Sequence, residues 1–261
     1  MAVSVFPLLE AAERVGGEQA DVTNLVPSGA EPHDIELSPD QVDLLLDADL
    51  ALYVGGGFQP AVEEIVAQRD GISMDIVAEV LPEEATDPHI WLDPLLMAEI
   101  VEVVARALSE IDPQGSPTYE EGAAEFREEI EVLHRRFQEE LESCERRTFV
   151  TTHEAFGHLA RRYDLVQRSV SGLSPEAEPD PATLAELEDL IVREGVTTVF
   201  TEPLVGPRVA ETLARETGAR VATLDPLEGV SREADSEATY VRLMERNLRA
   251  LREALGCRGG A

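Results

Sequence analysis

Short apolar runs alternate with amphipathic segments along most of this chain, and this alternation constrains its fold more than any other feature. The apolar runs have the length of buried strands, whereas the segments between them show the spacing of helices. Such alternation predicts an α/β architecture with parallel sheets, whose ligands bind beyond the C-terminal ends of the strands. We expect strands at Ser4–Pro7, Asp21–Val26, Leu50–Val54, Arg147–Thr151, Val196–Phe200 and Arg220–Leu224, and helices at Leu8–Val15, Ser38–Leu46, Pro60–Gln68, Ala155–Tyr163, Pro181–Glu194, Pro207–Thr217 and Glu237–Leu255.

One segment breaks the alternation, because residues 116–143 read as a single long helix. Apolar residues recur there at intervals of three and four, and neither proline nor glycine interrupts the pattern after Gly122. At about 1.5 Å per residue, this helix would be roughly 40 Å long and could connect two lobes. We therefore expect an N-terminal α/β lobe over residues 1–115, a rigid connecting helix over 116–143 and a C-terminal α/β lobe over 144–261. The apolar stripe comprises Phe126, Ile130, Leu133, Phe137 and Leu141.

The charge of the chain is strongly negative. Its 261 residues include 53 acidic and 21 basic ones, all of the latter arginine, for a formal net charge of −32. This charge disfavours binding to nucleic acid or to an anionic membrane surface and favours a cation as partner. Acidic residues spaced along exposed helix faces are typical of salt adaptation, and a general cation-gathering surface is the alternative.

The sequence leaves the cellular compartment open. No hydrophobic run approaches the roughly 20 residues that would span a bilayer, and the N-terminal residues lack the features of a secretory signal. Either the protein is cytoplasmic or a leader has been removed. Cys144 and Cys257 are far apart in sequence and do not form a metal-type pair. If they meet in space, a disulfide would fasten the C-terminus and would indicate an oxidising compartment.

Three of the five histidines stand in short, turn-rich motifs that are far apart in sequence. These are His33, His89 and His153, and Asp225 follows a predicted strand in a fourth motif. Three imidazoles and one carboxylate form a complete tetrahedral ligand set for Zn²⁺ or a related divalent metal. By contrast, His134 is expected to be a solvated residue of the long helix. His158 does not share a helix face with His153, so packing or a hydrogen bond to a ligand is the expected role.

Six motifs in the expected order give the chain a specific resemblance to the metal-binding solute-binding proteins of zinc and manganese ABC importers. The resemblance runs from about Val5 to about Cys257. It rests on Glu31-Pro32-His33, Asp87-Pro88-His89-Ile90-Trp91-Leu92-Asp93-Pro94, Thr152-His153-Glu154-Ala155-Phe156-Gly157, Gly172-Leu173-Ser174-Pro175-Glu176-Ala177-Glu178-Pro179, Thr201-Glu202-Pro203-Leu204 and Leu224-Asp225-Pro226-Leu227-Glu228-Gly229.

The resemblance implies two α/β lobes joined by one long helix, with a metal ion in the cleft between them. It implies His33, His89, His153 and Asp225 as the metal ligands, with Glu154 or Glu202 holding the imidazoles. Manganese carriers of the family usually have glutamate at the position of His153, so we expect zinc rather than Mn²⁺. The expected protein is a monomer that works outside the cytoplasmic membrane, delivers its ion to a membrane permease and pairs its two cysteines.

Two other functions are compatible with parts of the sequence. A zinc hydrolase would need an open coordination position and a base such as Glu154 or Glu202. Four protein ligands would fill the coordination shell, however, and hydrolase motifs such as His-Glu-x-x-His are absent. We therefore expect a binding protein rather than an enzyme. A metal-binding surface adhesin on the same scaffold is the second alternative.

Overall fold

The chain forms two compact units in a computed structural model that describes residues 1–81, 86–175, 180–229 and 238–258. Unit 1 comprises Met1–Val132 and Leu227–Tyr240, and unit 2 comprises Leu133–Pro226 and Val241–Ala261. The expected start of the last helix at Glu237 and the motif residues Glu176–Pro179 lie outside the described residues.

Unit 1 contains a four-stranded sheet in the order β2-β1-β3-β4, and every pairing in it is parallel. The central strand β1 is buried completely, as expected for a strand covered on both faces. A core cluster that includes Leu25, Leu45 and Val62 lies beside it. The strands are β1 (Ala2–Val3), β2 (Thr23–Asn24), β3 (Leu50–Tyr53) and β4 (Ile72–Asp75).

The helices of unit 1 follow these strands and carry clear start signals. Ser38 and Gln41 form a reciprocal capping box at the start of α2, and Asp93 accepts a hydrogen bond from the Leu95 N–H at the start of α5. Helix α1 packs along α5. The bounds are α1 (Phe6–Gly16), η1 (Gly17–Gln19), α2 (Pro39–Asp47), α3 (Pro60–Val66), α4 (Ile76–Val80), η2 (Ile90–Leu92) and α5 (Pro94–Ile111), the η segments being 3₁₀ helices.

The strand predicted at Ser4–Pro7 is wrong. The strand ends at Val3, and helix α1 already begins at Phe6. Pro7 stands in the first turn of this helix, where its missing N–H costs no hydrogen bond and its fixed φ suits the helix. An apolar run this short does not distinguish a strand from the start of a buried helix.

The predicted long helix is confirmed as α6 (Ser116–Leu141), and the boundary between the units falls within it. All five residues of the predicted apolar stripe are at most 1% exposed. Ion pairs to other helices flank the stripe, such as Arg14–Glu129 at 2.6 Å in unit 1 and Arg252–Glu140 at 2.6 Å in unit 2.

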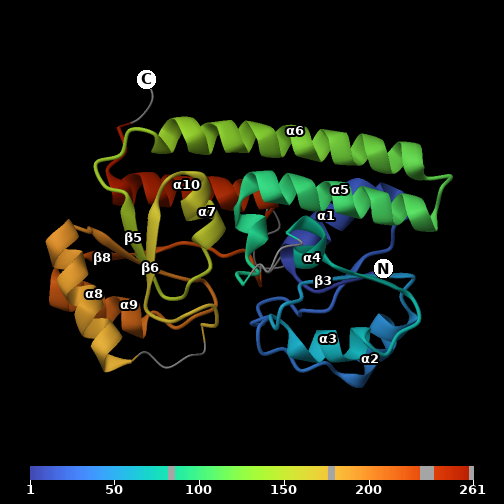
Figure 1. The fold of residues 1–261 in the computed structure, drawn as a ribbon, viewed down its shortest axis with the longest axis horizontal. Coiled ribbons are helices and arrows are strands. Elements are labelled where there is room, and N and C mark those ends of the chain that lie inside the picture. Colours follow the sequence, from blue (N-terminus) through green and yellow to red (C-terminus); the bar gives the residue numbers. More distant parts are fainter. Residues whose placement is uncertain (82–85, 176–179, 230–237, 259–261) are drawn as a thin grey trace. The chain divides into compact units, whose positions relative to one another are not determined.

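Unit 2 repeats the parallel arrangement, with strand order β6-β5-β7-β8 (Figure 1). Helices α8 and α9 pack against each other, and α9 contacts β7 and β8. The core between them includes Val150, Ile191, Val199 and Leu213. The bounds are β5 (Thr148–Thr151), α7 (Gly157–Arg162), β6 (Val166–Ser169), α8 (Pro181–Glu194), β7 (Thr198–Thr201), α9 (Arg208–Thr217), β8 (Arg220–Thr223) and α10 (Tyr240–Leu255).

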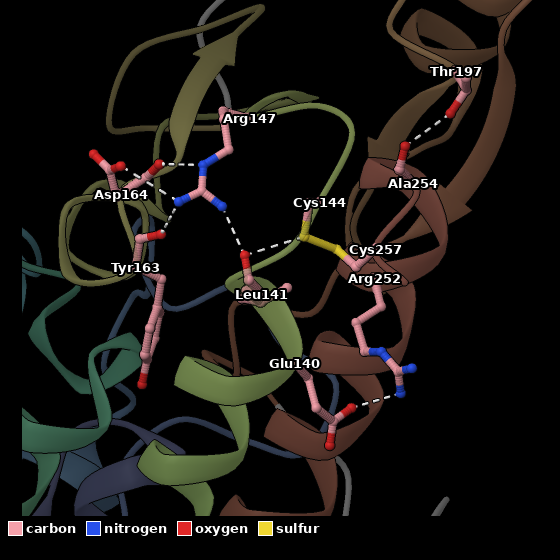
Figure 2. The surroundings of a disulfide bond; sticks show 10 residues. All are labelled: Glu140, Leu141, Cys144, Arg147, Tyr163, Asp164, Thr197, Arg252, Ala254 and Cys257. Atoms are coloured by element: carbon pink, nitrogen blue, oxygen red, sulfur yellow. Dashed lines mark hydrogen bonds and ion pairs between the residues drawn. A yellow bond between two sulfur atoms is a disulfide. The ribbon is translucent and has the colours of Figure 1, made fainter. Parts of the chain in front are cut away.

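A disulfide between Cys144 and Cys257 joins the segment after α6 to the end of α10 (Figure 2). The two cysteines also form an antiparallel backbone bridge. Figure 2 shows that the Arg147 guanidinium donates to the Leu141 carbonyl at 2.7 Å, and that the Thr197 hydroxyl donates to the Ala254 carbonyl at 2.9 Å. The C-terminal helix is thus fastened covalently, as the resemblance implied for paired cysteines.

Candidate metal-binding site

His89 is held by a carboxylate in the loop that leads into η2. Its side chain is completely buried. The Asp87 Oδ1 atom accepts the His89 backbone N–H at 3.0 Å and lies 2.8 Å from the ring Nδ1. An acceptor at Nδ1 keeps the proton on that atom, which leaves the lone pair on Nε2 for a ligand.

His33 lies beside His89 in unit 1. It stands in a turn after β2, and the two imidazole rings are 5.6 Å apart between centroids. The Phe58 ring lies 4.2 Å from His33 and 5.7 Å from His89. The Phe58 ring therefore packs against both imidazoles.

Glu228 brings a carboxylate to both imidazoles. Its Oε1 lies 3.0 Å from the His89 Nε2, and its Oε2 lies 3.6 Å from the His33 Nε2. The side chain is 2% exposed. Ligand atoms of these three residues lie within 4.8 Å of one another, so unit 1 alone offers two nitrogens and one oxygen to a single ion. This set suits Zn²⁺.

The backbone just before Glu228 has an unusual conformation. Leu227 has φ +61°, in the left-handed region that bulky side chains rarely adopt, and its side chain is fully buried. Backbone strain of this kind costs on the order of 1–3 kcal/mol and tends to occur at functional sites. Here the strained residue lies immediately before the carboxylate that faces the two imidazoles.

The environment of His89 favours its charged form. Burial lowers the pKa of this imidazole, but the hydrogen bonds and negative charges of Asp87 and Glu228 outweigh the burial, so the pKa is raised above its ordinary value. The site therefore attracts positive charge although it is buried. A divalent cation meets the same electrostatic demand as a proton on His89.

His153 lies in unit 2, two residues after the end of β5. Its side chain is completely buried, and its Nδ1 lies 2.6 Å from Oε2 of Glu202, which follows β7. The other carboxylate oxygen accepts the His153 backbone N–H at 3.3 Å and the hydroxyl of Thr152. Adjacent parallel strands thus place the two residues together at their C-terminal ends. Of the two carboxylates expected to hold an imidazole, Glu202 contacts His153, whereas the Glu154 side chain is exposed.

The other predicted residues lie in unit 2. Asp225 follows β8 and is fixed through its backbone, since its N–H donates to the Asn247 Oδ1 at 2.8 Å and its carbonyl accepts from Nδ2 at 2.7 Å. Its role as a ligand stays a prediction. His134 faces the hydroxyl of Tyr163 at 3.1 Å, and His158 lies 3.4 Å from a guanidinium nitrogen of Arg161.

Glu228 is the site residue that the sequence reasoning missed. It is part of the same motif as Asp225, three residues later, and the motif alone does not tell which carboxylate turns toward the histidines. The sequence did contain a signal for a functional role of Glu228, because it is the one charged residue from Pro226 to Gly229, and the others are apolar or small. A carboxylate within such a buried stretch is expected to have a partner.

Comparisons with known proteins agree over nearly the whole chain. The sequence profile of the family described as "Zinc-uptake complex component A periplasmic" matches residues 1–254. The high-affinity zinc uptake system protein ZnuA of Bacillus subtilis is 31% identical over 96% of this chain and 85% of its own length. The zinc-binding lipoprotein AdcA of Streptococcus pneumoniae is 32% identical over 98% of this chain, which spans 56% of that protein.

Solved structures give the same result. The laminin-binding protein Lmb of Streptococcus agalactiae, described as bifunctional with adhesin and metal transporting activity, has a TM-score of 0.89 at 32% identity and covers 97% of this chain and 98% of its own. The periplasmic zinc-binding protein TroA of Treponema pallidum, at 20% identity and a TM-score of 0.90 over 98% of both chains, shares the fold. The chain therefore belongs to the zinc-uptake complex component A family, whose members are solute-binding transport proteins and not enzymes.

Proposed function

We propose that this protein captures Zn²⁺ with His33, His89, His153 and one carboxylate, and delivers it to the membrane permease of an ABC importer. The observation that carries the proposal is the cluster in unit 1, where Glu228 faces the Nε2 atoms of His33 and His89 at 3.6 and 3.0 Å. His153 is oriented in the same way as His89. In each residue a carboxylate at Nδ1 favours the proton on that atom, so Nε2 is the nitrogen that would bind the ion.

The carboxylate ligand that we favour is Glu228. It is buried and already faces two of the imidazoles, and its negative charge would offset part of the charge of the ion. Asp225, which the sequence motif predicted, is the alternative carboxylate. Four protein ligands leave no open position for a substrate, which suits a carrier better than a catalyst.

The choice of metal follows from the donor atoms. Three imidazole nitrogens and one carboxylate oxygen are typical of zinc, whereas manganese prefers a larger share of oxygen ligands. The names of the relatives ZnuA and AdcA point to zinc as well. We therefore propose Zn²⁺ as the cargo and Mn²⁺ as a weaker competitor.

We further propose that the protein works outside the cytoplasmic membrane as a monomer that does not bind nucleic acid. The disulfide between Cys144 and Cys257 supports an oxidising compartment. Within the described residues, the structure contains no helix that is long and apolar enough to span a membrane. The net charge of −32 disfavours contact with phosphate backbones.

A surface adhesin is a second candidate function, because the similar protein Lmb is described as having both adhesin and metal transporting activity. Binding of the purified chain to immobilised laminin, measured at physiological and at high salt, tests it. Saturable binding that persists at high salt would support an adhesin function. Binding that disappears with salt would be non-specific electrostatic attraction.

The first test of the proposed function is calorimetric titration of the metal-stripped protein with Zn²⁺ and, separately, with Mn²⁺. We expect one tight zinc site and much weaker manganese binding. His33→Ala and His89→Ala should weaken zinc binding by more than the roughly 10–100-fold typical of losing a residue that only holds a ligand. His134→Ala is the matched control, because this imidazole lies on α6 and contacts Tyr163, which follows α7. The absence of a tight site, or equal effects of all three variants, would refute the proposal.

A further inference from the structure

Gln59 is a buried amide at the start of α3 with contacts to two other segments of unit 1. It is the N-cap residue of this helix, and its side chain is completely inaccessible to solvent. A buried amide costs free energy unless its hydrogen bonds are made. The partners of Gln59 therefore indicate what the residue does.

The amide nitrogen of Gln59 donates to two backbone carbonyls. One belongs to Ser4, after β1, at 3.0 Å, and the other belongs to Pro32 at 3.2 Å. An amide nitrogen has two hydrogens, so one is available for each carbonyl. The Oε1 atom of Gln59 has no hydrogen-bond partner among the residues that the structure describes. The polar role of the side chain thus rests on its nitrogen, which ties the loop at Pro32 to the core.

Pro32 directly precedes His33. The residue before Gln59, Phe58, supports the ring of His33 at 4.2 Å between centroids. Ser4 itself is fully buried, and its hydroxyl accepts the Val54 N–H at 3.3 Å, so one end of the connection is anchored at the centre of the sheet. Residues 58 and 59 therefore hold both the ring of His33 and the peptide before it.

We propose that Gln59 is a positioning residue for His33. By bonding the Pro32 carbonyl to the core, it fixes the turn that directs the imidazole toward Glu228. Asp87 and Glu202 hold their histidines through Nδ1, whereas Gln59 acts through the backbone one residue upstream. A ligand held in place before the ion arrives loses less freedom on binding, which raises affinity. This inference rests on the proposed role of His33 as a zinc ligand.

The variant Gln59→Met tests the inference, because it keeps the length of the side chain and removes both donors. Gln68→Met is the matched control, since this side chain is exposed just after α3 and its amide donates to the Glu64 carbonyl one turn earlier. Zinc affinity is measured by chelator competition in the wild-type background and again in the His33→Ala background. We expect a loss of about 10–100-fold in the first background, as for other residues that orient a ligand. No further loss is expected in the second background.

The possible outcomes distinguish a failure of the positioning role of Gln59 from a failure of the proposed ligand set. Unchanged affinity in Gln59→Met, or an equal loss in both backgrounds, would overturn the positioning role, the latter by showing a general structural effect. If His33→Ala itself leaves zinc affinity unchanged, the proposed ligand set fails, independently of Gln59.

If Gln59→Met does not fold, Gln59→Glu replaces it, because this variant keeps the shape of the side chain and lacks the amide donors. In the wild-type background, weaker zinc binding by folded Gln59→Glu supports the role, and wild-type affinity overturns it.

Discussion

The Nδ1 atom of His153 lies 2.6 Å from Oε2 of Glu202, and both side chains are buried within unit 2. A carboxylate can only accept a hydrogen bond at this position, so it favours the proton on Nδ1 and makes Nε2 the atom that can bind an ion. The same carboxylate accepts the hydroxyl of Thr152 and the backbone N–H of His153. Glu202 therefore fixes the imidazole and the peptide that carries it.

Glu202→Gln should weaken zinc binding by about 10–100-fold. The amide that replaces the carboxylate can turn its NH₂ toward Nδ1. This would favour the proton on Nε2, and a protonated Nε2 cannot bind the zinc ion. Chelator competition measures the affinity, and ¹⁵N spectra of the imidazole report which nitrogen carries the proton. Glu154→Gln, at the exposed neighbour, is the control and should bind like the wild type. An unchanged tautomer together with unchanged affinity in Glu202→Gln would contradict this role.

Glu228→Gln and Asp225→Asn distinguish the two candidate carboxylate ligands. We expect a large loss of zinc affinity in Glu228→Gln, because this carboxylate already faces His33 and His89. Asp225→Asn should have a small effect, since it keeps the backbone hydrogen bonds to Asn247. Titration calorimetry of the two variants decides between them. The reverse order would support the ligand that the sequence motif predicted.

The sequence predicted best those elements whose signals are local. Helix α8 has the predicted bounds Pro181–Glu194. The side chain of Asp180 accepts the Ala182 N–H at its start, and Gly195 ends it in a left-handed conformation with φ +65°. The stripe of α6 was predictable for a similar reason, because one buried face recurs at the helical period over many turns.

Among the elements that were not predicted are α5, β4 and β6. Helix α5 carries a narrow polar face of Glu99, Glu102, Arg106 and Glu110 at helical spacing, so its helical period was present in the sequence and was overlooked. Strands β4 and β6 are edge strands with partly exposed residues, and strand propensity is weak there.

The same limit applies to the site. Sequence motifs indicated the three histidines as candidates, but they did not indicate that Glu228, after the left-handed Leu227, faces His33 and His89. The role of Gln59 likewise depends on a contact between residues far apart in sequence. Such pairings follow from the tertiary structure.

Replacing both cysteines with serine should lower the free energy of unfolding by about 2–5 kcal/mol. The Cys144–Cys257 bond closes a loop over a sequence separation of 113, so its loss gives the unfolded chain much additional freedom. Urea denaturation with and without reductant measures the effect. Reductant should destabilise the wild type and leave the double variant unchanged. Equal stability of the two proteins under oxidising conditions would contradict a stabilising role.

Gly122→Ala should destabilise unit 1, although alanine forms helices better than glycine by about 1 kcal/mol. A Cβ at Gly122 would lie 2.6 Å from the Arg14 carbonyl oxygen and 3.0 Å from that of Val15, both backbone atoms of α1. Overpacking of this kind costs about 1–3 kcal/mol. The exposed Ala124→Gly on the same helix measures helix propensity alone. Urea denaturation gives both values, and stabilisation by Gly122→Ala would show that α1 and α6 can separate at a cost smaller than the gain in helix propensity.

Salt should raise the thermal stability of the protein. A net charge of −32 makes the folded chain repel itself, and salt screens this repulsion over a Debye length that falls from about 10 Å at 0.1 M to about 3 Å at 1 M. Salt also weakens surface ion pairs such as Arg14–Glu129, but each contributes only about 0–1 kcal/mol. The melting temperature of the metal-free protein, measured from low to molar sodium chloride, should therefore increase. Sucrose at equal osmolality, which is excluded from the surface without screening charge, should give a smaller increase. A melting temperature that falls with salt would mean that the ion pairs outweigh the net repulsion.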